Sequence, residues 1–206
     1  MEKMIVRIIK NAEETGQFID KVENYTGVRL PLEYVKNSKI VGVFLRNKLA
    51  AGYMIVTKPP FRSLLFVPDS IKKSNNFFVK DQFEMMEVNG LWIGPSIKKP
   101  QMQFRVWLSL AKNIIGARKK YLLLMSNSKN KNIEYLHSLT NPETLYEGSP
   151  DLMIGDKSHA NIRVAFTTRL NCFLCIPKYW IVVSKNRQRR AKIAAKQRNL
   201  VRAQGL

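Results

Sequence analysis

The chain has 206 residues, of which 45% are hydrophobic, so it can bury the core of one sizeable domain or two small ones, which excludes wholesale disorder. Its apolar runs are far shorter than the roughly 20 residues that cross a bilayer, and no signal-peptide cleavage site follows the first apolar segment, so we expect a cytoplasmic protein without a transmembrane segment. The 35 Lys and Arg residues outnumber the 15 Asp and Glu residues, and the net charge of +20 favours an anionic partner.

The first part of the sequence predicts a strand, a helix and a hairpin. Residues 4–9 form an apolar strand, and Asn11 with Glu14 three positions later makes a capping box that starts a helix. Gly27 ends that helix. Two β-rich runs around a short polar turn predict a hairpin over residues 39–56.

The central part alternates short apolar runs with polar connections. The run at residues 63–68 is a candidate strand, and residues 69–82, which lack a clear period, predict an exposed connection or a short helix. Residues 84–97 predict a strand that stops near Gly94. Residues 101–120 then place a set of apolar side chains along one helical face: Phe104, Trp107, Leu108, Ala111, Ile114 and Ile115.

The last third returns to strands. A strand at Tyr121–Met125 leads through a polar gap into a helix that extends to about Leu139, and further strands are expected at residues 143–148 and 161–177. This order predicts an α/β fold with one sheet, part antiparallel and part parallel, and helices on both faces.

Two cysteines lie close together, Cys172 and Cys175. A single Cys-x-x-Cys could be half of a zinc site or a redox pair, but no second such pair exists and the only histidines are His137 and His159. The pattern favours two small apolar residues in a buried strand, so we expect no metal site.

The end of the sequence carries much of the charge, because no acidic residue follows Asp156. We expect one domain over residues 1–184 and a basic, helix-favouring tail over residues 185–206. Such a tail could bind nucleic acid or an anionic membrane surface, or it could be a solvated terminus. Its cations are Lys185, Arg187, Arg189, Arg190, Lys192, Lys196, Arg198 and Arg202.

The order of the elements, and residues 121–139 in particular, resembles the GNAT acyltransferases (the Gcn5-related N-acetyltransferase family) over roughly residues 1–175. In that family the helix after the fifth strand begins with Asn, and a small apolar residue, a Leu and a Tyr follow at the third, sixth and seventh positions. The corresponding residues here are Asn130, Ile133, Leu136 and His137, the last in place of the Tyr.

This resemblance implies a GNAT-like sheet whose fourth and fifth strands, Leu91–Gly94 and Tyr121–Met125, are parallel neighbours that diverge at their C-terminal ends. The gap would accept the pantetheine arm of an acyl thioester, and the next helix would hold its phosphates at the N-terminus. The family's glycine-rich phosphate loop is matched by residues 98–104, with Gln in both glycine places. The implied donor-binding residues are Trp92, Ile93, Gly94, Lys98, Lys99, Gln101, Met102, Gln103 and Asn130.

The resemblance further implies an N-acyltransferase that moves an acyl group to an amine without a metal. Glu87 would be the base and His137 the acid for the leaving thiolate, with Tyr135 as a nearby alternative to His137. The altered loop leaves three possibilities open. Acyl-CoA binds through Lys98 and Lys99, the donor is an acyl carrier protein, or the donor site is lost.

In the third case the protein would be an inactive GNAT-like binder of nucleic acid or another polyanion through its tail. A further alternative is an acyltransferase at a membrane surface with a long-chain donor. The methionines near the predicted cleft would then suit an apolar acyl pocket: Met85, Met86, Met102 and Met125.

Overall fold

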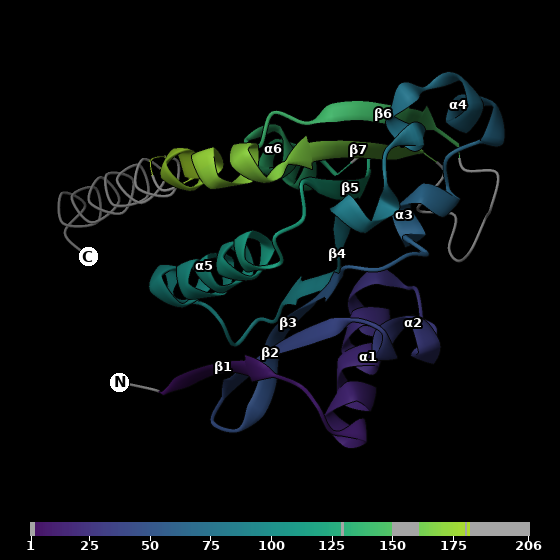
Figure 1. Ribbon diagram of the computed structural model, residues 1–206. Helices are drawn as coiled ribbons and strands as arrows, with labels where there is room; N and C mark the ends of the chain where they lie inside the picture. Colours follow the sequence, from purple (N-terminus) through teal and green to yellow (C-terminus); the bar gives the residue numbers. More distant parts are fainter. Residues whose placement is uncertain (1–2, 129, 150–160, 180, 182–206) are drawn as a thin grey trace, which may run out of the picture.

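The computed structural model describes residues 3–128, 130–149, 161–179 and 181. Seven strands form one sheet in the order β1-β2-β3-β4-β5-β7-β6, as Figure 1 shows. Every neighbouring pair is antiparallel except β4 and β5, which are parallel. The mixed α/β sheet expected from the sequence is therefore confirmed. The strands are β1 (Met4–Ile8), β2 (Lys39–Leu45), β3 (Lys48–Val56), β4 (Met85–Ile93), β5 (Tyr121–Asn127), β6 (Glu143–Gly148) and β7 (Ile162–Thr168).

Helices cover both faces of this sheet (Figure 1). On one face α1 packs Phe18 and Val22 into a cluster with Met54 of β3, and on the other α5 packs Leu110 into a cluster with Leu122 of β5. The expected two-sided cover is confirmed. The helices that precede β7 are α1 (Ala12–Thr26), α2 (Leu32–Lys36), α3 (Arg62–Leu65), α4 (Asp69–Ser74), α5 (Pro100–Gly116) and α6 (Lys131–Ser138), with short 3-10 helices η1 (Asn76–Val79) and η2 (Gln82–Glu84).

The local signals read from the first part of the sequence are confirmed. The side chain of Asn11 accepts a hydrogen bond of 2.7 Å from the N–H of Glu14 at the start of α1. Gly27 ends α1 in the left-handed region at φ 71°. Arg46 and Asn47 both have positive φ between β2 and β3, which is the geometry of a two-residue turn that matches the twist of a hairpin.

One candidate strand is not formed, and one predicted strand is wrong in its second half. The apolar run at residues 63–68 lies in and after the short helix α3, so it adds no strand. The last strand ends at Thr168, and residues 169–179 form a helix instead of continuing it. The Thr168 hydroxyl accepts a 3.2 Å hydrogen bond from the N–H of Asn171 and so caps that helix. Cys172 and Cys175 therefore lie on a helix and not in a strand.

The buried face of α5 also differs from the predicted one. Val106, Leu110 and Ile114 are buried, whereas Leu108 is about half exposed. The sequence is apolar on two sides of this helix, so the period alone does not decide which side meets the sheet. The hydroxyl of Tyr53 on β3 lies 2.7 Å from that of Ser109 on α5 and so holds the helix on this side.

A bulge in β4 sets its direction. Met54 pairs with Asn89 and Gly52 pairs with Trp92, so β4 contains one more residue than β3 over this stretch. Gly90 lies in the bulge at φ 58°, and an added Cβ there would lie 3.0 Å from Cγ2 of Val22. Only glycine therefore fits the bulge without strain.

We predict that Gly90→Ala lowers the free energy of unfolding by about 1–3 kcal/mol, because the left-handed φ and the contact with α1 both disfavour a side chain. Gly16→Ala is the control. It lies in α1, where an added Cβ meets nothing within 4 Å, and alanine should stabilise the helix by about 0.5–1 kcal/mol. Urea denaturation measures both changes, and equal effects would contradict the prediction.

Candidate functional site

The sheet opens between β4 and β5. These strands pair over three residues only, Met85–Glu87 with Tyr121–Leu123. Beyond Glu87, β4 stays paired with β3, and beyond Leu123, β5 stays paired with β7. The strands therefore diverge toward their carboxyl ends, which confirms the expected arrangement. The paired part precedes the Leu91–Gly94 segment named from the sequence, and that segment lies wholly in the diverged part.

The end of β4 leads directly into α5. The N–H of Gly94 donates to the carbonyl of Ala50 at 2.9 Å, and a Cβ on Gly94 would lie 2.7 Å from that oxygen, so glycine is needed here. Lys98 and Lys99 are exposed just before α5, and none of the helix's residues is acidic. Lys99 is the N-cap and provides no side-chain cap. The positive end of α5 and two cations thus meet at one place, which suits an anion.

The two glutamines in the glycine positions lie in the first turn of α5. Gln101 and Gln103 are exposed, and Nε2 of Gln103 donates to the carbonyl of Ile97 at 3.1 Å. Met102 is partly buried against the cluster that contains Ile97 and Val106. The side chain of Gln103 therefore forms a hydrogen bond within the loop, and a phosphate-binding role for Lys98 and Lys99 stays a prediction.

The side chain of Trp92 lies away from the opening, although its backbone is part of β4 there. It is buried on the α1 face, where its ring stacks on Tyr25 at 5.3 Å, and its Nε1 has no hydrogen-bond partner within the described part of the chain. Trp92 and Gly94 line a pocket of about 950 Å³ between α1, the β2–β3 turn and the end of β4, and no residue of β5 or α6 lines it. Ile93 packs on the opposite face, beside Ile97. A donor-binding role for Trp92 and Ile93 stays a prediction.

The other side of the opening is formed by the end of β5 and by α6. Asn130 is the N-cap of α6, and its side chain accepts a hydrogen bond of 3.3 Å from the N–H of Ile133. Glu134 accepts hydrogen bonds from Ser126 of β5 and from Arg163 of β7, the latter as a 2.6 Å ion pair. Burial raises the pKa of Glu134, but these two bonds outweigh it and lower the pKa overall. The sequence patterns did not reveal this anchor.

His137 lies near the end of α6. Burial lowers the pKa of His137 to about 4, Glu134 opposes the shift, and Arg163 adds to it. The imidazole is thus neutral near pH 7 and lacks the proton that the predicted acid would donate. The catalytic role of His137 stays a prediction, and this pKa disfavours it. Tyr135, the alternative, is exposed on α6.

Glu87 is 2% exposed and marks the last paired residue of β4 before the opening. Its carboxylate accepts hydrogen bonds from the hydroxyl of Tyr34, the N–H of Arg62 at 2.9 Å, and the N–H and hydroxyl of Ser63 at 3.0 and 2.6 Å. Burial, and then the nearby charge of Glu87, raise the pKa of Tyr34 well above its ordinary value, so the phenol stays protonated. Asn89 donates to the same phenol at 3.2 Å.

The two predicted catalytic residues are not brought together. Glu87 contacts α2 and α3 on the α1 face. Leu124 of β5 packs against α5, on the opposite face of the sheet. Ser126 lies two residues further along the strand, so its side chain is on the same face as that of Leu124, and it contacts Glu134 of α6. His137 is therefore on the α5 and α6 side of the sheet. With four donors on its oxygens, Glu87 is better placed to position Tyr34 and α3 than to touch a substrate.

Comparison with known proteins identifies the fold. No protein-family model and no curated protein matches the sequence. The structure of FeeM, an N-acyl amino acid synthase from uncultured soil microbes, matches with a TM-score of 0.60 at 10% identity, over 84% of this chain and 94% of that one. Arabidopsis thaliana NAA60, solved with acetyl-CoA, matches with a TM-score of 0.56 at 12% identity, over 81% and 98% of the two chains.

A GCN5-related N-acetyltransferase from Brucella melitensis also matches, with a TM-score of 0.52 at 10% identity, over 89% of this chain and 86% of that one. The chain therefore has the GNAT fold that its element order indicated. Within the described residues, no group of three or more His, Cys, Asp or Glu side chains could hold a metal ion. No helix of that same part is long and apolar enough to cross a membrane.

We predict that Glu87→Gln lowers the free energy of unfolding by about 2–4 kcal/mol, because an amide NH₂ would face the donors of Tyr34 and Ser63 in a buried site. The control is Glu84→Gln, since the Glu84 carboxylate forms an exposed ion pair with Lys120 at 3.8 Å. This change should alter the free energy of unfolding by less than about 0.5 kcal/mol. Urea denaturation distinguishes the two variants. A Glu87→Gln protein as stable as the natural chain would rule out the anchoring role.

We also predict that His137 makes folding sensitive to mild acid. The folded pKa of about 4 lies below the ordinary 6.5, so between these values the unfolded state binds more protons. The free energy of unfolding should fall by up to about 3 kcal/mol as pH drops through this window. In His137→Gln this loss should be absent. Denaturation curves from about pH 7 to about pH 4.5 test it, and parallel curves for the two proteins would refute it.

Proposed function

We propose that this protein transfers an acyl group from an acyl thioester to an amine. The observation that carries the proposal is the parting of β4 and β5 after three residue pairs. In the described part of the chain, no strand pairs with the β5-facing edge of residues 88–93. A pantetheine arm carries amides that can bond to such an edge as an added strand does.

The start of α5 supports a donor that carries phosphate. Lys98, Lys99 and the helix N-terminus lie at the carboxyl end of β4, where the phosphate end of an inserted arm would emerge. Both acyl-CoA and a carrier-bound phosphopantetheine have phosphate at this position. The acetyl-CoA complex of NAA60 and the acyl product named for FeeM lend support to thioester chemistry on this fold.

The transfer needs few protein groups. The amine attacks the thioester carbonyl, a C–N bond forms, the C–S bond breaks, and the proton lost by the amine balances the one that the thiolate gains. Backbone N–H groups on the β5-facing edge of β4 would stabilise the oxyanion. We place the acceptor on the α2 and α3 side, where Tyr34, Arg62 and Asn89 supply polar groups beside the last β4–β5 pair. Glu87 holds Tyr34 in place there and acts as a positioning residue.

Thermal shift and mass spectrometry test the proposal together. Acetyl-CoA or long-chain acyl-CoA should add RT ln(1 + [L]/Kd) to the free energy of unfolding and so raise the melting temperature. Replacing both Lys98 and Lys99 with Ala should weaken binding by about tenfold at low salt, and the difference should shrink as salt screens the charges. The control removes two exposed lysines at the far end of the sheet, Lys10 and Lys39.

The protein is incubated with a mixture of amines and amino acids and with the same thioesters, or with a carrier protein that bears an acyl group. Mass spectrometry should then detect an amine product that is one acyl group heavier. If no donor stabilises the protein and no acylated product forms, the proposed function is wrong. If the Lys98 and Lys99 double variant binds acyl-CoA as tightly as the Lys10 and Lys39 control, the phosphates bind away from the start of α5.

A further inference from the structure

The helix over residues 169–179 packs beside α5 on the same face of the sheet. The ring of Tyr179 lies 5.8 Å from that of Trp107 on α5, and Cys172 is buried in the cluster that α5 shares with the sheet. Burial raises the pKa of the Cys172 thiol to about 12, so it behaves as an apolar core group. The side of this helix that carries Cys172 and Tyr179 therefore packs against α5 and the sheet.

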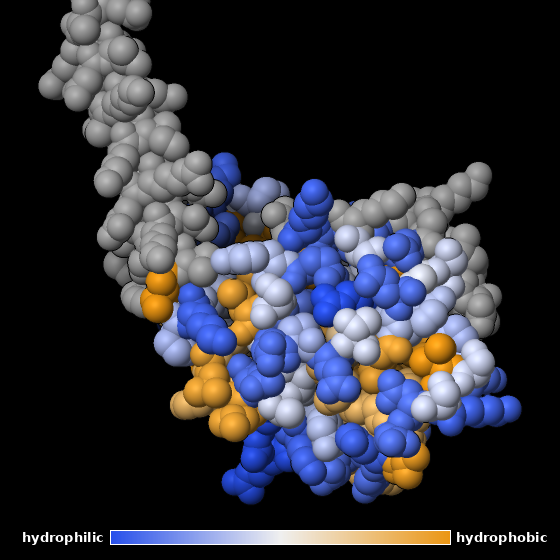
Figure 2. Space-filling view, turned by 90° about the horizontal axis from the view of Figure 1, so that it is seen from above, coloured by the Kyte–Doolittle hydropathy of each residue, from blue (hydrophilic) through white to orange (hydrophobic). Residues whose placement is uncertain are grey.

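The opposite side of the same helix is also apolar, but it is exposed. Leu170, Phe173 and Leu174 are 65%, 56% and 49% exposed, and Ile181 just beyond them is 51% exposed. At 100° per residue these positions fall within one arc of about 100°, away from Cys172. Figure 2 shows orange hydrophobic patches between blue hydrophilic ones on the face of the molecule that it views. We name Leu170, Phe173, Leu174, Pro177 and Ile181 the apolar row.

A helix that is apolar on both sides is normally buried on both sides. Scattered exposed apolar residues need no explanation, but four large ones aligned on one helix form a surface that favours a covering partner. Leu108 on the adjacent α5 is exposed as well.

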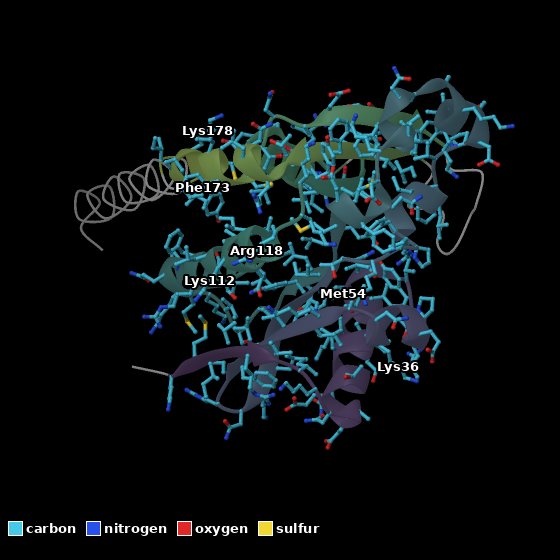
Figure 3. All side chains as sticks on the ribbon, in the orientation of Figure 1. Lys36, Met54, Lys112, Arg118, Phe173 and Lys178 are labelled. Atoms are coloured by element: carbon cyan, nitrogen blue, oxygen red, sulfur yellow. The ribbon has the colours of Figure 1, made fainter. Side chains whose placement is uncertain are left out.

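Cations flank the apolar row. Arg169 and Lys178 lie at its two edges by the same helical geometry, and Figure 3 shows Lys112 and Arg118 on and just after the neighbouring α5. The sequence from residue 157 to its end contains no acidic residue, and neither does α5. An apolar row edged by cations is complementary to a surface that is apolar inside and anionic outside.

We propose that the apolar row is the contact by which this protein lies on an anionic lipid bilayer. Its Leu, Phe and Ile side chains enter the boundary of the acyl chains, while Arg169 and Lys178 meet the headgroups. A nucleic acid would satisfy the cations but would leave the exposed Leu and Phe side chains uncovered, since most of its contacts are made through phosphate and sugar. The proposal stands on this surface alone and does not require the acyltransfer reaction.

The test is flotation of the full-length protein with vesicles. Binding should be strong with phosphatidylcholine containing about 30% phosphatidylglycerol and weak with phosphatidylcholine alone. The combined change Leu170→Gln, Phe173→Gln and Leu174→Gln should weaken binding to the anionic vesicles by at least about tenfold, because three apolar side chains are no longer inserted. Circular dichroism and the melting temperature check that the variant remains folded.

The matched control is Val79→Gln with Phe83→Gln, two apolar side chains that are more exposed than Phe173 and lie on the η1–η2 segment. It should bind vesicles as the natural protein does. Unchanged vesicle binding in the triple variant would overturn the proposal and assign any binding to charge alone. Binding to RNA without vesicle binding, or a dimer in light scattering that the triple change dissociates, would also overturn it.

Discussion

The limit of three residue pairs between β4 and β5 is the constraint on which the candidate site depends. Two features adjoin it. Glu87, in the last pair, is tied by four hydrogen bonds to α2 and α3 on one face. Three residues later, the Gly90 bulge bends β4 against α1. The buried carboxylate of Glu87 and the glycine bulge therefore both lie where β4 leaves β5.

The face of the sheet that carries α5 combines the proposed donor end of the opening with the apolar row. Lys98 and Lys99 lie at the start of α5, and Tyr179 packs on Trp107 farther along the same helix. If the apolar row rests on a bilayer, α5 is held close to the lipid surface. A lipophilic acyl chain or product would then pass between membrane and protein over a short distance. The two proposals are independent, but together they describe one oriented face.

Features set by neighbouring residues were predictable, and features set by distant ones were not. The Asn11 cap, the Gly27 stop and the hairpin turn depend on residues within four positions of each other. The partners of Glu87 lie 53 and 24 positions earlier, at Tyr34 and Ser63, so the pattern could suggest a base but not an anchor. The segment over residues 169–179 predicts a strand from sequence because residues 172–177 are continuously apolar, and a short continuous apolar run does not separate a buried strand from a helix.

Residues 98–104 correspond to the glycine-rich phosphate loop of the GNAT family, with glutamines in the two glycine places. In a glycine-lined loop the backbone itself approaches the phosphates, whereas here Gln103 bonds to Ile97 within the loop, and attraction is left to Lys98 and Lys99. Two lysines at a helix N-terminus are enough for the single phosphodiester of a carrier-bound arm. Pro100 has no N–H, and the N–H groups of Met102 and Gln103 already donate to the carbonyl of Lys99 at 2.9 and 3.1 Å, so few backbone donors are left for a diphosphate. Within the proposed function, the altered loop therefore favours a donor whose affinity comes mainly from its pantetheine arm, its acyl chain or its carrier protein.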